Sequence, residues 1–182
     1  MLTRRRLLTG GGLALAGLDV GRPSGAAPVV EILMKSDPAG AEVWFDPIGV
    51  YVRPGRTVRW IVEANVHTTT AYRPKNDGHS LRIPEAAIPW DSGFLVNRGD
   101  HFEVRLTVPG VYDYYCQPHE AAGMVGRIVG RPVGPGAMPF DCFQRRSGTE
   151  TWKPVPEAAQ KTFPSVESIM RERIVERKRG AL

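Results

Sequence analysis

Short runs of alternating apolar and polar residues, separated by glycine and proline, dominate the chain between residues 28 and 130. RTVRWIVEA (56–64) and HFEVRLTV (101–108) place apolar side chains at every second position. A period of two is typical of a strand that has one buried face and one face in water. About seven such runs follow one another, at the spacing expected for a sandwich of two sheets.

Turn-forming residues support the same interpretation. Pro54-Gly55 and Pro109-Gly110 end two of the runs, and the chain has 20 Gly and 16 Pro. No stretch of 28–130 keeps the period of a helix. A length of 182 residues suits one domain with appendages. We therefore predict an all-β fold, a Greek-key β-sandwich of antiparallel strands, followed by a C-terminal extension.

The first 27 residues resemble an export signal. Arg4, Arg5 and Arg6 precede an apolar, glycine-rich stretch, and small residues near Ala26 and Ala27 offer a cleavage site. The apolar part is too short to cross a bilayer comfortably. The consecutive arginines followed by two leucines resemble the twin-arginine export motif. We expect a periplasmic or extracellular protein; a merely basic N-terminus and an uncleaved, tethering signal are the alternatives.

The basic charge of the chain lies at its ends. The sequence pI is about 9.5, yet residues 28–130 carry ten Lys/Arg against twelve Asp/Glu, a net charge of −2. Residues 131–182 carry ten against six, a net charge of +4. A nucleic-acid-binding protein needs its basic residues gathered on the folded domain. We therefore expect no nucleic acid among the partners.

The segment YCQPHEAAGMVG (115–126) gathers three metal-binding side chains, those of Cys116, His119 and Met124. His67 follows the run 56–64 and can meet this segment at one end of a sandwich. Thiolate and thioether ligands favour Cu(I), whereas imidazole also suits Cu(II). Two imidazoles and one thiolate with a weak axial thioether make the ligand set of a blue-copper site. We therefore predict a copper site at these four residues.

The same residues resemble the cupredoxin family of blue-copper proteins, which includes plastocyanin-, pseudoazurin- and halocyanin-like members. The pattern is Cys-x₂-His-x₄-Met preceded by an aromatic residue, and the resemblance covers roughly 29–130. It implies a Greek-key sandwich, one copper ion cycling between Cu(I) and Cu(II), and single-electron transfer between a redox donor protein and an acceptor protein. It also implies that His67, Cys116 and His119 are equatorial ligands, that Met124 is axial, and that His119 lies nearest the surface.

Two positions depart from the common pattern of that family. Thr68 stands where many relatives have Asn, whose side chain ties this loop to the cysteine loop; the Thr68 hydroxyl offers a weaker tie. Gln117 stands where many have Ser or Thr, so the hydrogen bonds to the thiolate are expected to differ. Residues 71–94 are longer than a minimal cupredoxin needs, and we expect them to fold over the end near His67.

Other functions fit the residues less well. Zinc accepts two His and one Cys, but a thioether is a poor zinc ligand. Multicopper enzymes need further histidines for a second metal site, and this chain has 4 His. A nucleophilic Cys116–His119 pair would leave Met124 without a role. We therefore expect an electron carrier and not an enzyme. A periplasmic copper carrier or buffer, which delivers or stores copper, is the alternative.

The remaining histidines and the second cysteine lack such support. We expect His79 and His101 to lie on the solvated surface, because neither belongs to a ligand pattern. Cys142 lies in a different kind of sequence from Cys116, and we expect no disulfide bond between them.

Residues 131–182 form a proline-rich extension whose end is amphipathic. The aromatic residues between 140 and 163 are too apolar for a plain disordered tail. One helix is predicted at about 165–179, with Ser165 as its N-cap. Its apolar stripe contains Val166, Ile169, Met170 and Ile174. We expect the helix to dock on its own domain; a contact with a partner or with a membrane surface remains open.

Overall fold

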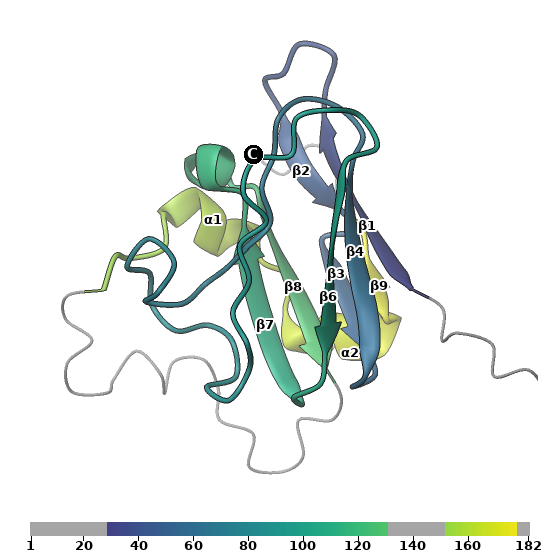
Figure 1. Cartoon of the computed structure of the whole chain (residues 1–182), viewed down its shortest axis with the longest axis vertical. Coiled ribbons are helices and arrows are strands. Elements are labelled where there is room, and N and C mark those ends of the chain that lie inside the picture. The colour runs from purple at the N-terminus through teal and green to yellow at the C-terminus, as the bar shows by residue number, and fades with distance from the viewer. Residues whose placement is uncertain (1–28, 131–151, 178–182) are drawn as a thin grey trace, which may run out of the picture.

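The computed structural model describes residues 29–130 and 152–177, and these form two packed β-sheets with short helices packed around them (Figure 1). The first sheet contains β1 (Val30–Ser36), β2 (Val43–Asp46), β4 (Arg56–Val62) and β6 (His101–Leu106). The second contains β3 (Gly49–Val52), β5 (Thr70–Ala71), β7 (Gly110–Tyr115), β8 (Val125–Gly130) and β9 (Ile174–Val175). The predicted all-β sandwich is confirmed.

The expectation that all the strands are antiparallel was wrong for two pairs of neighbours. The strand orders are β2-β1-β4-β6 and β5-β7-β8-β3-β9, and most neighbours run antiparallel. However, β1 lies parallel to β4, and β3 lies parallel to β8. Each sheet is therefore mixed. Alternation along a strand reports which face is buried but carries no information on the direction of the neighbouring strand.

The main core lies between the two sheets. On β4, Val58, Trp60 and Val62 are all buried, as the alternation predicts. The ring of Trp60 packs against Tyr114 from the opposite sheet, with ring centroids 5.2 Å apart. Cys116 and Met124 belong to this same core. The core therefore continues directly beneath the predicted metal site.

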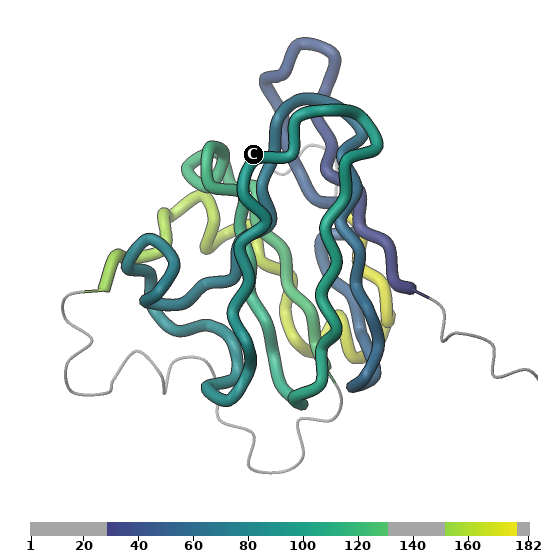
Figure 2. Tube along the Cα trace, viewed as in Figure 1, coloured from purple at the N-terminus to yellow at the C-terminus, as the bar shows by residue number. Residues whose placement is uncertain are grey.

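The connection from β5 to β6, residues 72–100, contains no regular helix or strand; in Figure 2 it forms loops on the side where β5 pairs with β7. Its later part folds back on the end of the sandwich as expected. Leu95 forms an antiparallel bridge with His67, and Asp91 forms one with Thr70. The loop therefore covers the segment that carries His67.

The described part of the extension packs on its own domain, but its secondary structure differs from the expected single helix. It contains α1 (Glu157–Thr162), α2 (Val166–Glu172) and the strand β9. Ser165 caps α2 as predicted, with its hydroxyl accepting a hydrogen bond from the Ser168 N–H at 3.0 Å. The helix ends at Glu172 and not near residue 179, because Arg173 adopts a left-handed conformation with φ of 70°. No helix in the described residues is long and apolar enough to cross a membrane.

The apolar stripe of the predicted helix is divided between two elements. Ile169 is buried on α2, whereas Ile174 is 59% exposed and lies on β9. Gly49 makes room for the helix, because a Cβ atom there would lie 2.8 Å from Ile169. Docking of the extension on the domain is therefore confirmed for 152–177, although only part of the stripe is buried.

A buried carboxylate joins the extension to the sandwich. Asp113 on β7 accepts hydrogen bonds from the guanidinium groups of Arg82 and Arg127, each at 2.8 Å. Both guanidinium groups lie 5.0 Å from the ring centroid of Phe163. Arg127 also donates to the Pro164 carbonyl at 2.8 Å. Phe163 therefore docks between two cations that Asp113 holds in place.

Candidate metal centre

Cys116 lies where β7 ends and a 3-10 turn, η1 (Gln117–Ala122), begins. Its side chain is fully buried, and its backbone N–H donates to the Met124 carbonyl at 3.0 Å. Pro118 stands in the first turn of η1, where its missing N–H leaves no bond unmade. The loop thus returns on itself and brings residue 124 back beside Cys116.

His67 approaches from the opposite sheet, just beyond the end of β4. Its backbone exchanges two hydrogen bonds with Leu95, at 3.1 and 2.9 Å. Its ring is fully buried, with Nδ1 3.7 Å from the Cys116 Sγ and Nε2 3.4 Å from the Ser36 hydroxyl. The Ser36 contact leaves Nδ1 directed at the sulfur.

His119 completes a three-residue cluster. Its Nδ1 lies 3.4 Å from the Cys116 Sγ, and its ring centroid is 5.1 Å from that of His67. One ligand atom from each of the three residues lies within 4.8 Å of the others. His119 is only partly buried, whereas His67 and Cys116 are fully buried. The structure therefore brings together three of the four predicted ligands around one point, with one of them reaching the surface.

Met124 has the fourth predicted side chain, and the backbone places it on the same loop. Its N–H donates to the His119 carbonyl at 3.1 Å, and its carbonyl accepts from Cys116. The side chain is fully buried. Gly123, which precedes it, turns with φ of 84°, a conformation that glycine adopts without strain. Met124 is thus fixed by hydrogen bonds to two of the clustered residues.

Burial favours the neutral form of all three clustered side chains. Burial, aided by the neighbouring His119, lowers the pKa of His67 to about 4. Burial also lowers the pKa of His119, so both imidazoles are neutral at neutral pH, as metal ligands must be. Burial raises the pKa of the Cys116 thiol to about 11, opposed by the hydrogen bond from the Thr68 N–H. A metal ion must therefore displace the thiol proton.

Thr68 makes the tie between loops that the sequence suggested. Its hydroxyl accepts a hydrogen bond from the Gln117 N–H at 2.8 Å, and its own N–H donates to the Cys116 Sγ at 3.3 Å. The Gln117 side chain turns away from the sulfur, toward Asp77 at 3.2 Å and Asp91 at 3.4 Å. The Thr68 N–H thus reaches the sulfur from the loop that carries His67.

The expectation for His79 was wrong, since its side chain is fully buried. Its Nε2 lies 3.2 Å from the Glu120 Oε2, and the ring packs 4.8 Å from the Tyr115 ring. The sequence interpretation also missed Glu120, which is only 5% exposed, and its partner Tyr72. The one available signal was the position of Glu120, directly after a ligand in a tight loop. His101 is exposed, as predicted, and Cys142 lies outside the described residues.

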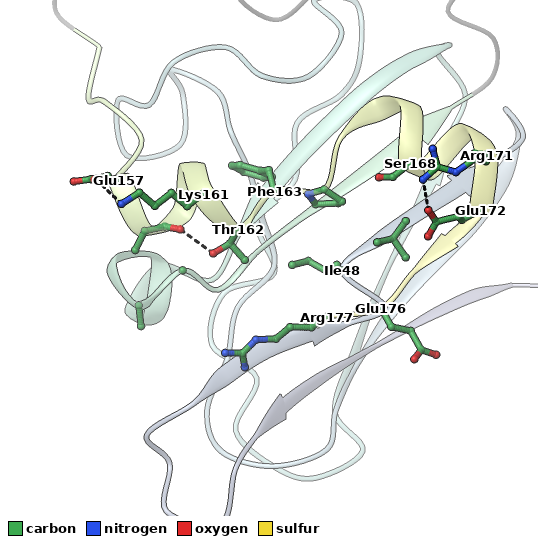
Figure 3. A pocket seen from close by; sticks show the side chains of 15 residues that line it. Ile48, Glu157, Lys161, Thr162, Phe163, Ser168, Arg171, Glu172, Glu176 and Arg177 are labelled. Atoms are coloured by element: carbon green, nitrogen blue, oxygen red, sulfur yellow. Dashed lines mark hydrogen bonds and ion pairs between the residues drawn. The ribbon is translucent and has the colours of Figure 1, made fainter. Parts of the chain in front are cut away.

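A separate pocket of about 820 Å³ lies between the two short helices, β9 and the end of η1 (Figure 3). It is lined by Gly123 but by none of the four predicted ligands. Two ion pairs lie along its lining, Lys161 with Glu157 and Arg171 with Glu172, each at 2.6 Å. The pocket is therefore distinct from the metal cluster.

Comparison with known proteins agrees with this geometry. Residues 31–130 match the family model described as copper binding proteins, plastocyanin/azurin family. The chloroplastic plastocyanin of Oryza sativa subsp. indica is 31% identical over 115 residues, which cover 58% of this chain and 65% of that protein. The matched region thus spans less than two thirds of that relative. The pseudoazurin of Methylorubrum extorquens AM1 is 27% identical over 130 residues, covering 71% of this chain and 78% of that protein.

Solved structures show the same fold. The pseudoazurin structure from Methylobacterium extorquens AM1 superposes with a TM-score of 0.52 at 21% identity, covering 74% of this chain and 92% of that one. The family model matches more than half of the chain and includes all three clustered residues, His67, Cys116 and His119. The chain therefore belongs to the plastocyanin/azurin family of copper-binding proteins, and its cofactor is one copper ion.

Proposed function

We propose that this protein is a mononuclear blue-copper electron carrier. In this proposal His67, Cys116 and His119 are the strong ligands and Met124 is the weak axial one. The observation that carries it is the arrangement of two imidazole Nδ1 atoms around one buried sulfur, at 3.7 and 3.4 Å. Such a His₂Cys set with a nearby methionine is the ligand set of blue-copper electron-transfer sites.

The donor set fits copper by its own chemistry. A thiolate and a thioether suit Cu(I), and neutral imidazoles suit both oxidation states. When bound, the copper ion supplies a one-electron change between Cu(I) and Cu(II). The protein supplies neutral His67 and His119 rings, a buried sulfur at Cys116 and a site from which bulk water is largely excluded. Copper binding would therefore require only one change of protonation among these residues, the loss of the Cys116 thiol proton.

The backbone around the cluster favours electron transfer over copper delivery. His67 is held by its bridge to Leu95, and Cys116 is held by its hydrogen bond to Met124. A fixed ligand set changes little between oxidation states, so little reorganisation opposes the transfer of an electron. Rapid release of the ion would instead need a loop that opens. These contacts support the carrier over the alternative of a copper store.

His119 is the proposed point of electron exit and entry, because it is the one clustered residue that is partly exposed. Phe94 and Val96, on either side of Leu95, are 64% and 57% exposed and add apolar surface at this end. Proteins of this family transfer electrons to redox partner proteins, and we infer a donor and an acceptor that dock here. The exposed charged face of α2 remains available for a further partner or membrane contact.

We place the protein outside the cytoplasm, in the periplasm or beyond it, because residues 1–27 resemble a twin-arginine signal. These residues lie outside the described part of the chain. Sequencing the N-terminus of protein recovered from a periplasmic extract checks the assignment. A mature protein that begins near Ala26 or Ala27 is expected, and retention of the uncleaved chain in the cytoplasm would contradict it.

The visible spectrum tests the proposed site directly. The purified chain loaded with Cu(II) is expected to show an intense blue or green charge-transfer band that ascorbate bleaches reversibly. Cys116→Ser should abolish the band, whereas Cys142→Ser, which changes the other cysteine, should keep it. Met124→Leu should keep the copper and shift the reduction potential, since an axial thioether tunes the site more than it holds the ion.

Two outcomes would refute the carrier. A colourless protein that holds one tight zinc ion would exclude blue copper. Steady reduction of oxygen or nitrite, in proportion to copper content and lost in Cys116→Ser, would show an enzyme. Reversible single-electron exchange without such turnover is the expected result.

A further inference from the structure

Glu120 is a buried carboxylate that directly follows His119 in η1. The Tyr72 hydroxyl donates to its Oε1 at 2.6 Å, and the His79 Nε2 lies 3.2 Å from its Oε2. Burying a carboxylate costs free energy unless hydrogen bonds replace those of water. Here the Tyr72 hydroxyl supplies one hydrogen bond and the His79 ring lies close to the other oxygen, and neither residue belongs to the metal cluster. The fold therefore places two buried polar side chains against one residue of the ligand loop, the segment 116–124.

These partners come from outside the sandwich core. Tyr72 and His79 belong to the long connection between β5 and β6. The Tyr72 ring packs on Tyr115, the residue before Cys116, with centroids 4.4 Å apart. Both tyrosines belong to a second, smaller core. Its further members are Val125, Val155, Ala159 and Phe163.

The extension holds the same loop at its other end. A Cβ atom at Gly123 would lie 2.9 Å from the Thr162 Oγ1 and 3.4 Å from the Ala158 carbonyl, so α1 lies directly on the end of η1. At the start of the described part of the extension, the Lys153 N–H donates to the Gly78 carbonyl at 2.8 Å, beside His79. The connection and the extension thus contact each other, and both pack against η1.

We propose that Glu120 is a positioning residue for the ligand loop, fixing through Tyr72 and His79 the turn that presents His119 to the metal. The inference rests on the proposed function, because it assigns His119 as a ligand. It goes further in assigning the tuning of that ligand to a carboxylate, a tyrosine and a histidine that contact no metal. The six-residue turn then has its orientation set from outside as well as from the sandwich core.

Two substitutions in the full chain separate positioning from charge. Glu120→Gln and Glu120→Ala both remove the carboxyl group, so a purely electrostatic change is common to both. The glutamine carbonyl still accepts from Tyr72, and the alanine makes no such bond. The difference between the two variants therefore reports positioning. Glu157→Gln, at an exposed carboxylate on the neighbouring α1, is the matched control.

The first measurement is hydrogen exchange of residues 117–124 in the copper-free chain. Glu120→Ala should accelerate this exchange by about tenfold or more, because opening of the turn no longer has to break the hydrogen bond to Tyr72. Glu120→Gln keeps that bond and should accelerate the exchange clearly less. In the copper-loaded chain, Glu120→Ala should shift the charge-transfer band and the reduction potential relative to Glu120→Gln. Glu157→Gln should match the unsubstituted chain in every measurement.

Equal exchange, band position and potential in the alanine and glutamine variants would overturn the proposal, even if both melt at lower temperature. If Glu120→Ala fails to fold, Tyr72→Phe removes one hydrogen bond alone and should produce smaller changes of the same sign; no change there would also overturn it. A chain that never shows a blue or green band refutes the proposed function instead, and the copper-free exchange still decides whether Glu120 holds the loop.

Discussion

The two sides of the ligand loop are held by different parts of the molecule. The inner side, at Cys116 and Met124, packs on the core between the sheets. The outer side, at Tyr115 and Val125, packs on a smaller core to which the extension contributes Val155, Ala159 and Phe163. The proposed ligands thus rest on the main core, whereas the residues beside them rest on a core that the extension completes.

Removing the outer side should have the largest effect. Truncation after Gly130 deletes the buried side chains of Val155, Ala159 and Ile169 and exposes their partners. At about 2 kcal/mol for each large apolar side chain, the free energy of unfolding should fall by on the order of 5 kcal/mol. Thermal unfolding of the copper-free chain measures this loss. An unchanged midpoint would mean that the outer core contributes nothing.

Substitution of Phe163 alone should lower the free energy of unfolding by less than the truncation does. Phe163→Ala removes the ring that lies between Arg82 and Arg127, and we expect a cost of about 3 kcal/mol from lost packing and cation–π contacts. Denaturant unfolding gives the value. Phe94→Ala is the control, since its ring is 64% exposed and should cost less than about 0.5 kcal/mol. Equal effects of the two would contradict a specific role for Phe163.

On the inner side, the buried histidines should make the free energy of unfolding depend on pH. His67 has a folded-state pKa of about 4, below its ordinary value of 6.5, so the folded chain favours the neutral ring. The stability that this group contributes is complete above pH 6.5 and is lost as the pH falls toward 4. His119 changes in the same direction. Copper-free protein should lose on the order of 3 kcal/mol across this window.

Unfolding measured between pH 7 and 4 tests this loss. His67→Asn should flatten the dependence, whereas His101→Asn, at an exposed histidine, should leave it unchanged. A dependence of equal slope in both variants would show that other groups cause it.

The smallest effect is expected at the tie between the two ligand-bearing loops. Thr68→Val removes the acceptor of the Gln117 N–H and should cost about 1 kcal/mol. It should also alter the reduction potential, because the lost tie lets the Thr68 N–H, which valine retains, shift relative to the Cys116 sulfur. Thr107→Val, at an exposed strand end, is the control. A potential equal to that of the control would remove Thr68 from the tuning of the site.

The inner side was largely predictable from sequence. The spacing of Cys116, His119 and Met124 is local, and strand alternation places His67 beyond a buried run. The outer side was not, because burial of His79 depends on contacts with Tyr115 and Glu120 of the distant segment 115–126 as well as with Tyr72. No periodicity along one segment reports such contacts.

The end of the predicted helix was missed for a related reason. An apolar residue at 174 fits a helical stripe as well as it fits a strand, and the left-handed turn at Arg173 decides between them. That turn is favoured by pairing of β9 with β3, a contact between residues more than a hundred positions apart. Parallel pairing of β1 with β4 is likewise a property of the whole topology.

The strand β9 also covers the edge of the second sheet. Without it β3 would present the hydrogen-bonding edge of its sheet to solvent, next to the apolar residues Val50 and Val52. The chain satisfies that edge itself, with the Ile48 N–H donating to Val175 at 2.9 Å and the Tyr51 N–H donating to Arg173 at 2.8 Å. An open edge recruits strands from other molecules. By closing it, the extension removes a route to self-association.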